Sequence, residues 1–203
     1  MVSLDVDSER VPDPSAHHAP RLLSISGNVG VGKSTLGPLV AARLNAPWIS
    51  ETDISNHFST LVADPNAHSR FITQIAFTAL YTASVLSRFV SGESVVVCER
   101  SAWDHRVFYR FWRERCEWNP AFDETMRRVE EALVSHPTRY SVHTAFLRCD
   151  CSELARRTAG RGADFDHTFS SDVLRALDEA YEAARGAGEV EGLFGIFDVT
   201  ELN

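Results

Sequence analysis

The sequence predicts an α/β fold in which a five-stranded parallel sheet is covered by helices on both faces. Short apolar runs alternate along the 203 residues with segments of helical periodicity. This alternation is typical of a parallel sheet, because each strand must be followed by a helix that returns the chain across the sheet. The first apolar run also leads into a glycine-rich turn and a helical pattern, which fits a strand, turn and helix unit.

Five apolar runs are predicted to form the strands. They cover residues 21–26, 47–50, 94–98, 141–148 and 194–199. The third run, Val95-Val96-Val97-Cys98, shows the pattern most clearly, because β-branched residues favour an extended chain. No internal repeat or second domain boundary separates the runs, so one sheet in one domain is expected.

Helical periodicity predicts two helices before the third strand. In the first, Leu36, Val40 and Leu44 repeat every four residues and are expected to form the buried face. The second is long, and its core-facing stripe is expected to be Ile72, Ile75, Ala79, Ala83, Leu86 and Val90. Its opposite side carries Gln74, Phe77, Tyr81 and Val85. A helix that is apolar on both sides is either buried or lines a pocket.

Two further helices are predicted later in the chain. Asn119 before Pro120 is a good helix start, and Pro137 is expected to end that helix. Its apolar stripe is Phe122, Met126, Val129 and Leu133. The last helix is expected to bury Val173, Leu177, Tyr181 and Ala184.

Composition and charge restrict the kind of protein. Residues 1–20 mix acids, prolines and serines and are expected to form a disordered tail before a single domain at 21–203. The net charge of −8 argues against a binder of nucleic acid polymers and favours a small substrate. The four cysteines are scattered, so reduced thiols are favoured over a zinc site. No apolar run resembles a membrane span or signal peptide, so a cytoplasmic protein without membrane contact is expected.

A phosphate-binding motif lies in the first turn. Its sequence is Gly27-Asn28-Val29-Gly30-Val31-Gly32-Lys33-Ser34, which fits G-x-x-x-x-G-K-[ST]. The glycines allow backbone N–H groups to converge on a β-phosphate, and the following helix adds the positive end of its dipole. Lys33 is expected to reach the β- and γ-phosphates, and the Ser34 hydroxyl to bind Mg²⁺. The alternative is a glycine-rich turn that binds nothing.

Three further features follow the ends of predicted strands. Glu51 comes directly after the second strand, and Glu99 and Arg100 follow the third. Ligands of open parallel sheets bind beyond the carboxyl ends of the strands, so these residues are expected to share a crevice with Lys33. A carboxylate there suits Mg²⁺, and arginines, including those in residues 156–161, could clamp a phosphoryl group. Taken singly, the same residues also fit a turn, a surface ion pair or a solvated helix face.

With these motifs the chain resembles the deoxyribonucleoside kinase family, from about residue 21 to the C-terminus. The family's phosphate loop is matched by residues 27–35, and its E-R-S motif by Glu99-Arg100-Ser101. The aromatic-rich helix after that motif is similar to residues 103–112, and the lid segment is similar to residues 147–162. The resemblance implies a three-layer P-loop kinase fold with a five-stranded parallel sheet and an arginine-bearing lid.

The resemblance also implies a reaction, the ATP-dependent transfer of a γ-phosphoryl group to the 5′-hydroxyl of a nucleoside or deoxynucleoside. It implies Glu51 as the general base, with Arg100 and Lys33 as further catalytic residues. Ser34 and Glu99 are expected to hold Mg²⁺ as the cofactor. The residues expected to bind ATP are Gly27, Asn28, Val29, Gly30, Val31, Gly32, Lys33, Ser34, Thr35, Arg157 and Arg161.

The acceptor site is expected to differ from that of the family. The residues expected there are Glu51, Gln74, Tyr81, Arg100, His105, Tyr109 and Asp166. Gln74 falls on the family's base-reading glutamine, whereas Tyr81 and His105 replace an arginine and an aspartate that are common beside it. Tyr109 could stack on the base and Asp166 could bind a sugar hydroxyl. A rearranged base pocket is therefore expected, unless Tyr81 and His105 simply pack in the core.

Two other classes of function stay open. A kinase that acts on a modified nucleoside or another small alcohol is consistent with the altered base-reading pair. A nucleotide-binding regulator is the second alternative, although it would not need a proton acceptor such as Glu51. The expected partners are ATP and a nucleoside, and the long helix could pair in a homodimer.

Overall fold

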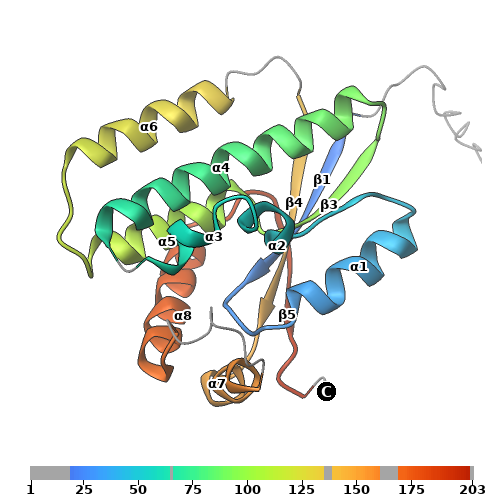
Figure 1. Cartoon of the computed structure of the whole chain (residues 1–203). Coiled ribbons are helices and arrows are strands. Elements are labelled where there is room, and N and C mark those ends of the chain that lie inside the picture. The colour runs from blue at the N-terminus through green and yellow to red at the C-terminus, as the bar shows by residue number, and fades with distance from the viewer. Residues whose placement is uncertain (1–18, 65, 135–138, 161–168, 202–203) are drawn as a thin grey trace, which may run out of the picture.

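The computed structural model describes residues 19–64, 66–134, 139–160 and 169–201, which form a five-stranded sheet with helices around it (Figure 1). The strands are β1 (Arg21–Gly27), β2 (Trp48–Ile49), β3 (Val95–Glu99), β4 (Ser141–Arg148) and β5 (Leu193–Asp198). They lie in the order β2-β3-β1-β4-β5, and every pair is parallel. The predicted α/β class and sheet are confirmed, and the expected strand ends differ by no more than one residue.

The helices connect the strands in chain order. Those before β3 are α1 (Lys33–Leu44), α2 (Glu51–Ser55), α3 (Ser59–Ala63) and α4 (Ala67–Val90). Those after β3 are α5 (Ala102–Arg113), α6 (Ala121–Val134), α7 (Cys151–Ala159) and α8 (Ser171–Gly186). The short helices α2 and α3 were not expected, because five residues are too few to show a helical period.

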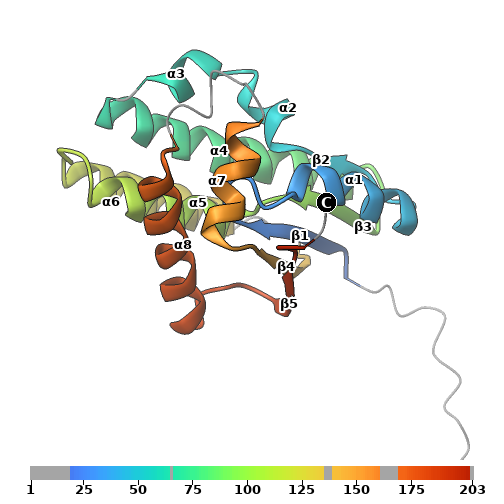
Figure 2. The ribbon, with the colours of Figure 1, turned by 90° about the horizontal axis from the view of Figure 1, so that it is seen from below.

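Both faces of the sheet are covered by helices (Figures 1 and 2). On one face, Ile25 of β1 packs with Ala41 of α1. On the other face, Leu22 of β1 packs with Phe77 of α4, and Phe146 of β4 packs with α5 and α8. Because side chains alternate along a strand, each central strand contributes to both layers. The result is the expected three-layer arrangement.

The buried face of α1 differs from the expected one. Gly37 and Ala41 are buried, whereas Leu44 is 49% exposed, and the other two residues of the expected stripe are partly buried. The Trp48 ring of β2 lies so close to Gly37 that a Cβ there would overlap it. Helix α1 therefore approaches the sheet through its smallest residues, and the expectation was wrong for Leu44.

The stripe expected to face the core from α4 lies on its outer side, with Val90 74% exposed. The residues that pack toward the sheet are Phe77, Tyr81, Val85 and Phe89. Ile72 and Ile75, at the other end of the helix, pack toward α6. Both sides of α4 are apolar, so periodicity could not select the sheet-facing side, and the aromatic side occupies it. The expectation that α4 lines a pocket agrees with the structure.

Helices α6 and α8 agree better with the sequence. The Asn119 side chain accepts a hydrogen bond from the backbone N of Ala121 at 2.9 Å, which begins α6 as expected. In α8, Leu177 and Tyr181 are fully buried. Pro137 and nearly all of the expected N-terminal tail lie outside the described residues.

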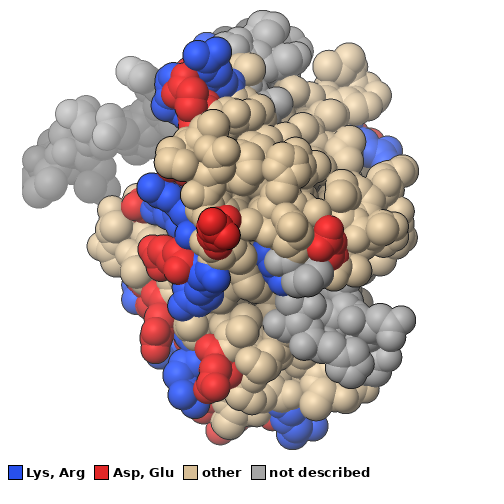
Figure 3. Space-filling model, turned by 60° about the vertical axis from the view of Figure 1, so that its left-hand side comes forward, with Lys and Arg blue, Asp and Glu red and all other residues tan. Residues whose placement is uncertain are grey.

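The surface in Figure 3 carries acidic and basic side chains next to one another. On α6, for example, Glu124 pairs with both Arg127 (2.8 Å) and Arg128 (2.7 Å). Within the described ranges, none of the helices combines the length and apolar character needed to cross a membrane.

Candidate active site

The glycine-rich turn between β1 and α1 has a backbone shape that side chains would disturb. Gly27 has φ +132°, and a Cβ there would overlap the carbonyl oxygen of Leu147. The Asn28 side chain anchors the turn to α8, because its Nδ2 donates to the Leu174 carbonyl at 2.9 Å. Val31 is buried in the core. The side chains of Asn28 and Val31 therefore support the turn, and the backbone N–H groups are the parts suited to a phosphate.

Lys33, the only lysine in the chain, is buried at the start of α1. Its Nζ donates to the carbonyls of Gly27 (3.1 Å) and Asn28 (2.7 Å) within the turn. Burial, assisted by nearby Arg100, lowers the pKa of Lys33 to about 8, although Glu99 opposes this effect. The amine is thus placed where a bound phosphate would compensate for its burial.

Glu99, at the end of β3, connects two helix starts. Its Oε1 accepts a hydrogen bond from Ser34 Oγ at 2.8 Å, and its Oε2 accepts one from the Glu51 backbone N at 3.2 Å. A hydroxyl and a carboxylate beside a phosphate loop are the oxygen donors that Mg²⁺ prefers, with phosphates and water completing its shell. The described residues include no cluster of three or more His, Cys, Asp or Glu that could hold a metal without such help.

Glu51 and Arg100 form an ion pair close to the Ser34 hydroxyl and the Glu99 carboxylate. Arg100 Nε donates to Glu51 Oε2 at 2.7 Å, and Arg100 is only 2% exposed, whereas Glu51 is 24% exposed. Burial raises the pKa of Glu51, but Arg100 and Lys33 together outweigh it, so this pKa lies below its usual value. Burial likewise opposes the charge on Arg100, but Glu51, with Tyr181 and Asp104, outweighs it, so the pKa of Arg100 is raised. Both groups are charged at neutral pH.

A cavity of about 550 Å³ extends from these residues between the short helices α2 and α3 and the helices α4 and α5. Three residues that line it carry a buried polar atom without a hydrogen-bond partner among the described residues, namely Thr73 Oγ1, Gln74 Oε1 and His105 Nε2. Burial lowers the pKa of His105 to about 3, so its ring is neutral. The ring stacks on Phe77, with centroids 4.9 Å apart and planes 7° apart. Buried polar atoms are normally paired, so the three atoms are suited to a bound ligand.

The apolar wall of the cavity is not the one expected from the sequence. Phe108 and Trp112 line it, whereas Tyr109 faces α6, where its hydroxyl bonds Asp123. Phe108 and Trp112 lie three and seven positions after His105, which is the spacing of one helix face and a signal that could have identified them. Tyr81 lies against the His105 ring, at a centroid distance of 5.3 Å, and does not line the cavity.

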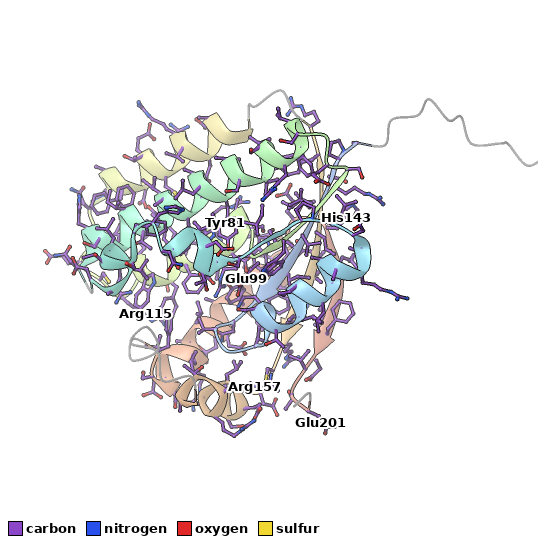
Figure 4. The ribbon with its side chains drawn as sticks, turned by 45° about the vertical axis from the view of Figure 1, so that its right-hand side comes forward. Tyr81, Glu99, Arg115, His143, Arg157 and Glu201 are labelled. Atoms are coloured by element: carbon purple, nitrogen blue, oxygen red, sulfur yellow. The ribbon has the colours of Figure 1, made fainter. Side chains whose placement is uncertain are left out.

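The expected lid residues are only partly described. Arg157, on α7, donates to Glu153 Oε1 (2.6 Å) and to the carbonyls of Val199 (2.9 Å) and Thr200 (3.2 Å). Figure 4 shows it apart from Glu99, at the end of the molecule that carries the C-terminus. The structure therefore places Arg157, which was expected to bind ATP, apart from Glu99 (Figure 4). Arg161 and Asp166 lie outside the described residues.

The fold and this site define a phosphotransferase of the P-loop kinase class. A model of the deoxynucleoside kinase family matches residues 23–191, and the chain belongs to that family. It is therefore a nucleoside kinase, which uses ATP to phosphorylate the 5′-hydroxyl of a nucleoside.

The individual proteins that resemble this chain share only a modest part of its sequence. The deoxyadenosine/deoxycytidine kinase of Bacillus subtilis (strain 168) is 26% identical over 172 residues, which are 82% of this chain and 78% of that protein. The deoxyadenosine kinase from M. mycoides with bound dATP is similar in structure, with a TM-score of 0.72 at 16% identity over 90% of this chain and 92% of that chain. The same enzyme with bound dCTP gives a TM-score of 0.71 at the same identity and coverage. At this identity the structural likeness establishes the fold alone.

Proposed function

We propose that the chain phosphorylates a deoxynucleoside bound in the 550 Å³ cavity, with its 5′-hydroxyl directed toward Glu51. The observation that carries this proposal is the position of the Glu51 and Arg100 pair. The pair lines the same cavity as Lys33 and Gln74. Lys33 belongs to the phosphate loop, and Gln74 has an amide oxygen without a hydrogen-bond partner among the described residues. The cavity thus joins a phosphate loop to polar groups suited to a base.

The direct test is transfer of labelled phosphate from ATP to a panel of deoxynucleosides, ribonucleosides, modified nucleosides and simple alcohols. Transfer to the 5′-position of at least one deoxynucleoside is the expected result. Transfer to a simple alcohol with no nucleoside phosphorylated would contradict the proposal and favour the other acceptor class.

On the donor side, Lys33 and the backbone N–H groups of residues 27–35 would hold the phosphates of ATP. Ser34 and Glu99 would hold Mg²⁺, which when bound neutralises charge on the β- and γ-phosphates. The hydrogen bond between Ser34 Oγ and Glu99 Oε1 supports this role, because it already brings two oxygen donors together.

On the acceptor side, Glu51 would accept the proton of the 5′-hydroxyl. Its position supports this role, because the carboxylate lines the cavity and Arg100 keeps it in the ionised form that can accept a proton. Arg100 would stabilise charge on the transferred phosphoryl group. The place of Arg157 beyond the end of β5 supports contact with a part of ATP other than the γ-phosphate. For Arg161 and Asp166 the proposal rests on the resemblance alone.

The base would be read by Gln74 and His105. Replacing either with alanine is expected to lower kcat/KM for the preferred nucleoside by about 10- to 100-fold, because a lost buried hydrogen bond leaves its partner unsatisfied at a cost of about 1–3 kcal/mol. Measuring kcat/KM for deoxyadenosine, deoxycytidine, deoxyguanosine and thymidine shows whether either substitution also changes the order in which the enzyme prefers these nucleosides. Tyr81→Phe is the matched control, since Tyr81 lies behind His105 and outside the cavity. An unchanged ranking in both alanine variants would contradict base reading by these residues.

We also propose a cytoplasmic location and a homodimer. The location is supported by the four cysteines, which are all unbonded, as is usual where thiols stay reduced. The dimer is supported by the outer side of α4, where Leu80 and Val90 are exposed.

A further inference from the structure

A buried hydrogen-bond network contacts Arg100 through residues that do not line the cavity. Tyr181 of α8 and Asp104 of α5 are both fully buried. The Tyr181 hydroxyl accepts a hydrogen bond from Arg100 Nη1 (2.6 Å) and donates one to Asp104 Oδ1 (3.0 Å). Asp104 Oδ2 in turn accepts from Ser26 Oγ of β1 at 2.6 Å. Side chains of β1, α5 and α8 thus form one hydrogen-bond network that reaches the Arg100 guanidinium through Tyr181.

The network divides the hydrogen bonds of Arg100 between two sides. Arg100 Nε donates to Glu51, which lines the cavity. Nη1 donates to Tyr181 and to the Gly27 carbonyl (3.2 Å), and it lies 3.9 Å from Asp104 Oδ1. A guanidinium is planar, so the contacts at Nε and Nη1 together set the orientation of the whole group. Tyr181 accepts the shorter of the two hydrogen bonds from Nη1, and without it, among the described residues, only the 3.2 Å bond to the Gly27 carbonyl would hold that nitrogen.

The backbone of Arg100 has an unfavourable conformation that the surrounding residues must stabilise. Its φ of +68° is left-handed, which a residue other than glycine adopts at a cost and keeps only when its surroundings enforce it. Asp104 provides part of that enforcement, because Oδ2 also accepts a hydrogen bond from the Ser101 backbone N at 2.9 Å. Asp104 therefore holds the backbone immediately after Arg100 and, through Tyr181, the end of the Arg100 side chain.

We propose that Tyr181 and Asp104 are positioning residues for phosphoryl transfer, which hold the Arg100 guanidinium in the orientation that serves both Glu51 and the transferred group. This inference rests on the proposed roles of Arg100 and Glu51. It makes α8, which the sequence predicts only as a packing helix, a determinant of turnover.

Tyr181→Phe is the primary test, because it removes the hydroxyl and keeps the ring that packs against Trp103 and Phe146. The expected result is a kcat about 10- to 100-fold lower, with KM for ATP and nucleoside changed less than about twofold, because a small displacement of a catalytic group costs this much turnover. Asp104→Asn is a second variant with a similar expected kcat, since it keeps the side-chain shape but loses the charge. Thr144→Val is the control, because it removes another buried hydroxyl, bonded to the Glu191 carbonyl, outside the cavity.

A double-mutant cycle separates positioning from stability. In single-turnover assays of folded protein, Tyr181→Phe is expected to slow the rate in an otherwise natural chain and to have almost no effect when Arg100 is already methionine. Thr144→Val is expected to leave the rate unchanged in both backgrounds.

Two results would overturn the inference. The first is a natural rate for Tyr181→Phe. The second is a loss of rate that is fully repeated in the Arg100→Met background, because Tyr181 would then act independently of Arg100. If Arg100→Met alone kept the natural rate, the proposed role of Arg100 would fail first and the positioning role with it, so the two failures are distinguishable.

Discussion

Replacing Glu51 with glutamine is expected to lower kcat by about 10²- to 10⁴-fold, which is the usual contribution of a positioned general base. Glutamine keeps the size of the side chain and an oxygen that can accept the Arg100 hydrogen bond, but it cannot take the proton of a hydroxyl. Binding of ATP and nucleoside should therefore stay within a few-fold of the natural values. Equilibrium binding together with single-turnover rates measures both quantities.

Asp53→Asn is a suitable control for this change. Asp53 lies on the same short helix as Glu51, is exposed and does not line the cavity, so the same chemical change there is expected to leave kcat unaltered. If Glu51→Gln turned over at the natural rate, Glu51 would be only a helix-start residue, and the proton would leave by another route.

Replacing Lys33 with alanine is expected to lower kcat/KM for ATP by about 30- to 5000-fold. This range corresponds to the roughly 2–5 kcal/mol that is lost when one partner of a buried charged contact is removed. No second lysine exists in the chain to replace it, and Arg100 Nε and Nη1 are already bonded to Glu51, Tyr181 and Gly27. The kinetics should be accompanied by a thermal melt, because Lys33 also bonds two carbonyls of the turn.

Arg43→Ala provides the comparison for Lys33. Arg43 is an exposed cation in the last turn of the same helix, and its loss is expected to leave the ATP kinetics unchanged. Full activity of a folded Lys33→Ala variant would remove the phosphate-loop assignment, whereas loss of the fold would be visible in the melt.

The sequence predicted the sheet well because its signals are local. Each strand is a short apolar run, and the turn after β1 is specified by glycines that a side chain at Gly27 would disrupt. The order of the strands was not predicted, because it depends on which distant strands pair. The sheet-facing side of α4 was predicted wrongly, because Phe77 and Ile75 are both apolar and lie on different sides of one helix.

In the candidate site, the charged residues at the edge of the sheet were predicted from the sequence, whereas the cavity wall and the contacts behind Arg100 were not. Glu99 ends β3, Glu51 and Arg100 follow strands closely, and Lys33 begins the helix after the β1 turn. Parallel strands bring such positions to one edge of the sheet. The cavity wall was missed by one position at Phe108, because neighbouring aromatic residues in α5 all fit a buried helix face. The contact of Tyr181 with Asp104 spans 77 positions and leaves no local pattern.

The single buried lysine has a practical consequence for studying this enzyme. Apart from the α-amino group, Lys33 is the only primary amine that an acylating reagent can modify. Burial lowers its pKa to about 8, so at mildly alkaline pH a larger fraction of it is the nucleophilic free amine than of an ordinary lysine. Because Lys33 Nζ is buried and bonded to two carbonyls of the turn, covalent labelling followed by mass spectrometry, with and without ATP, would measure how well the turn and a bound triphosphate each protect that one nitrogen.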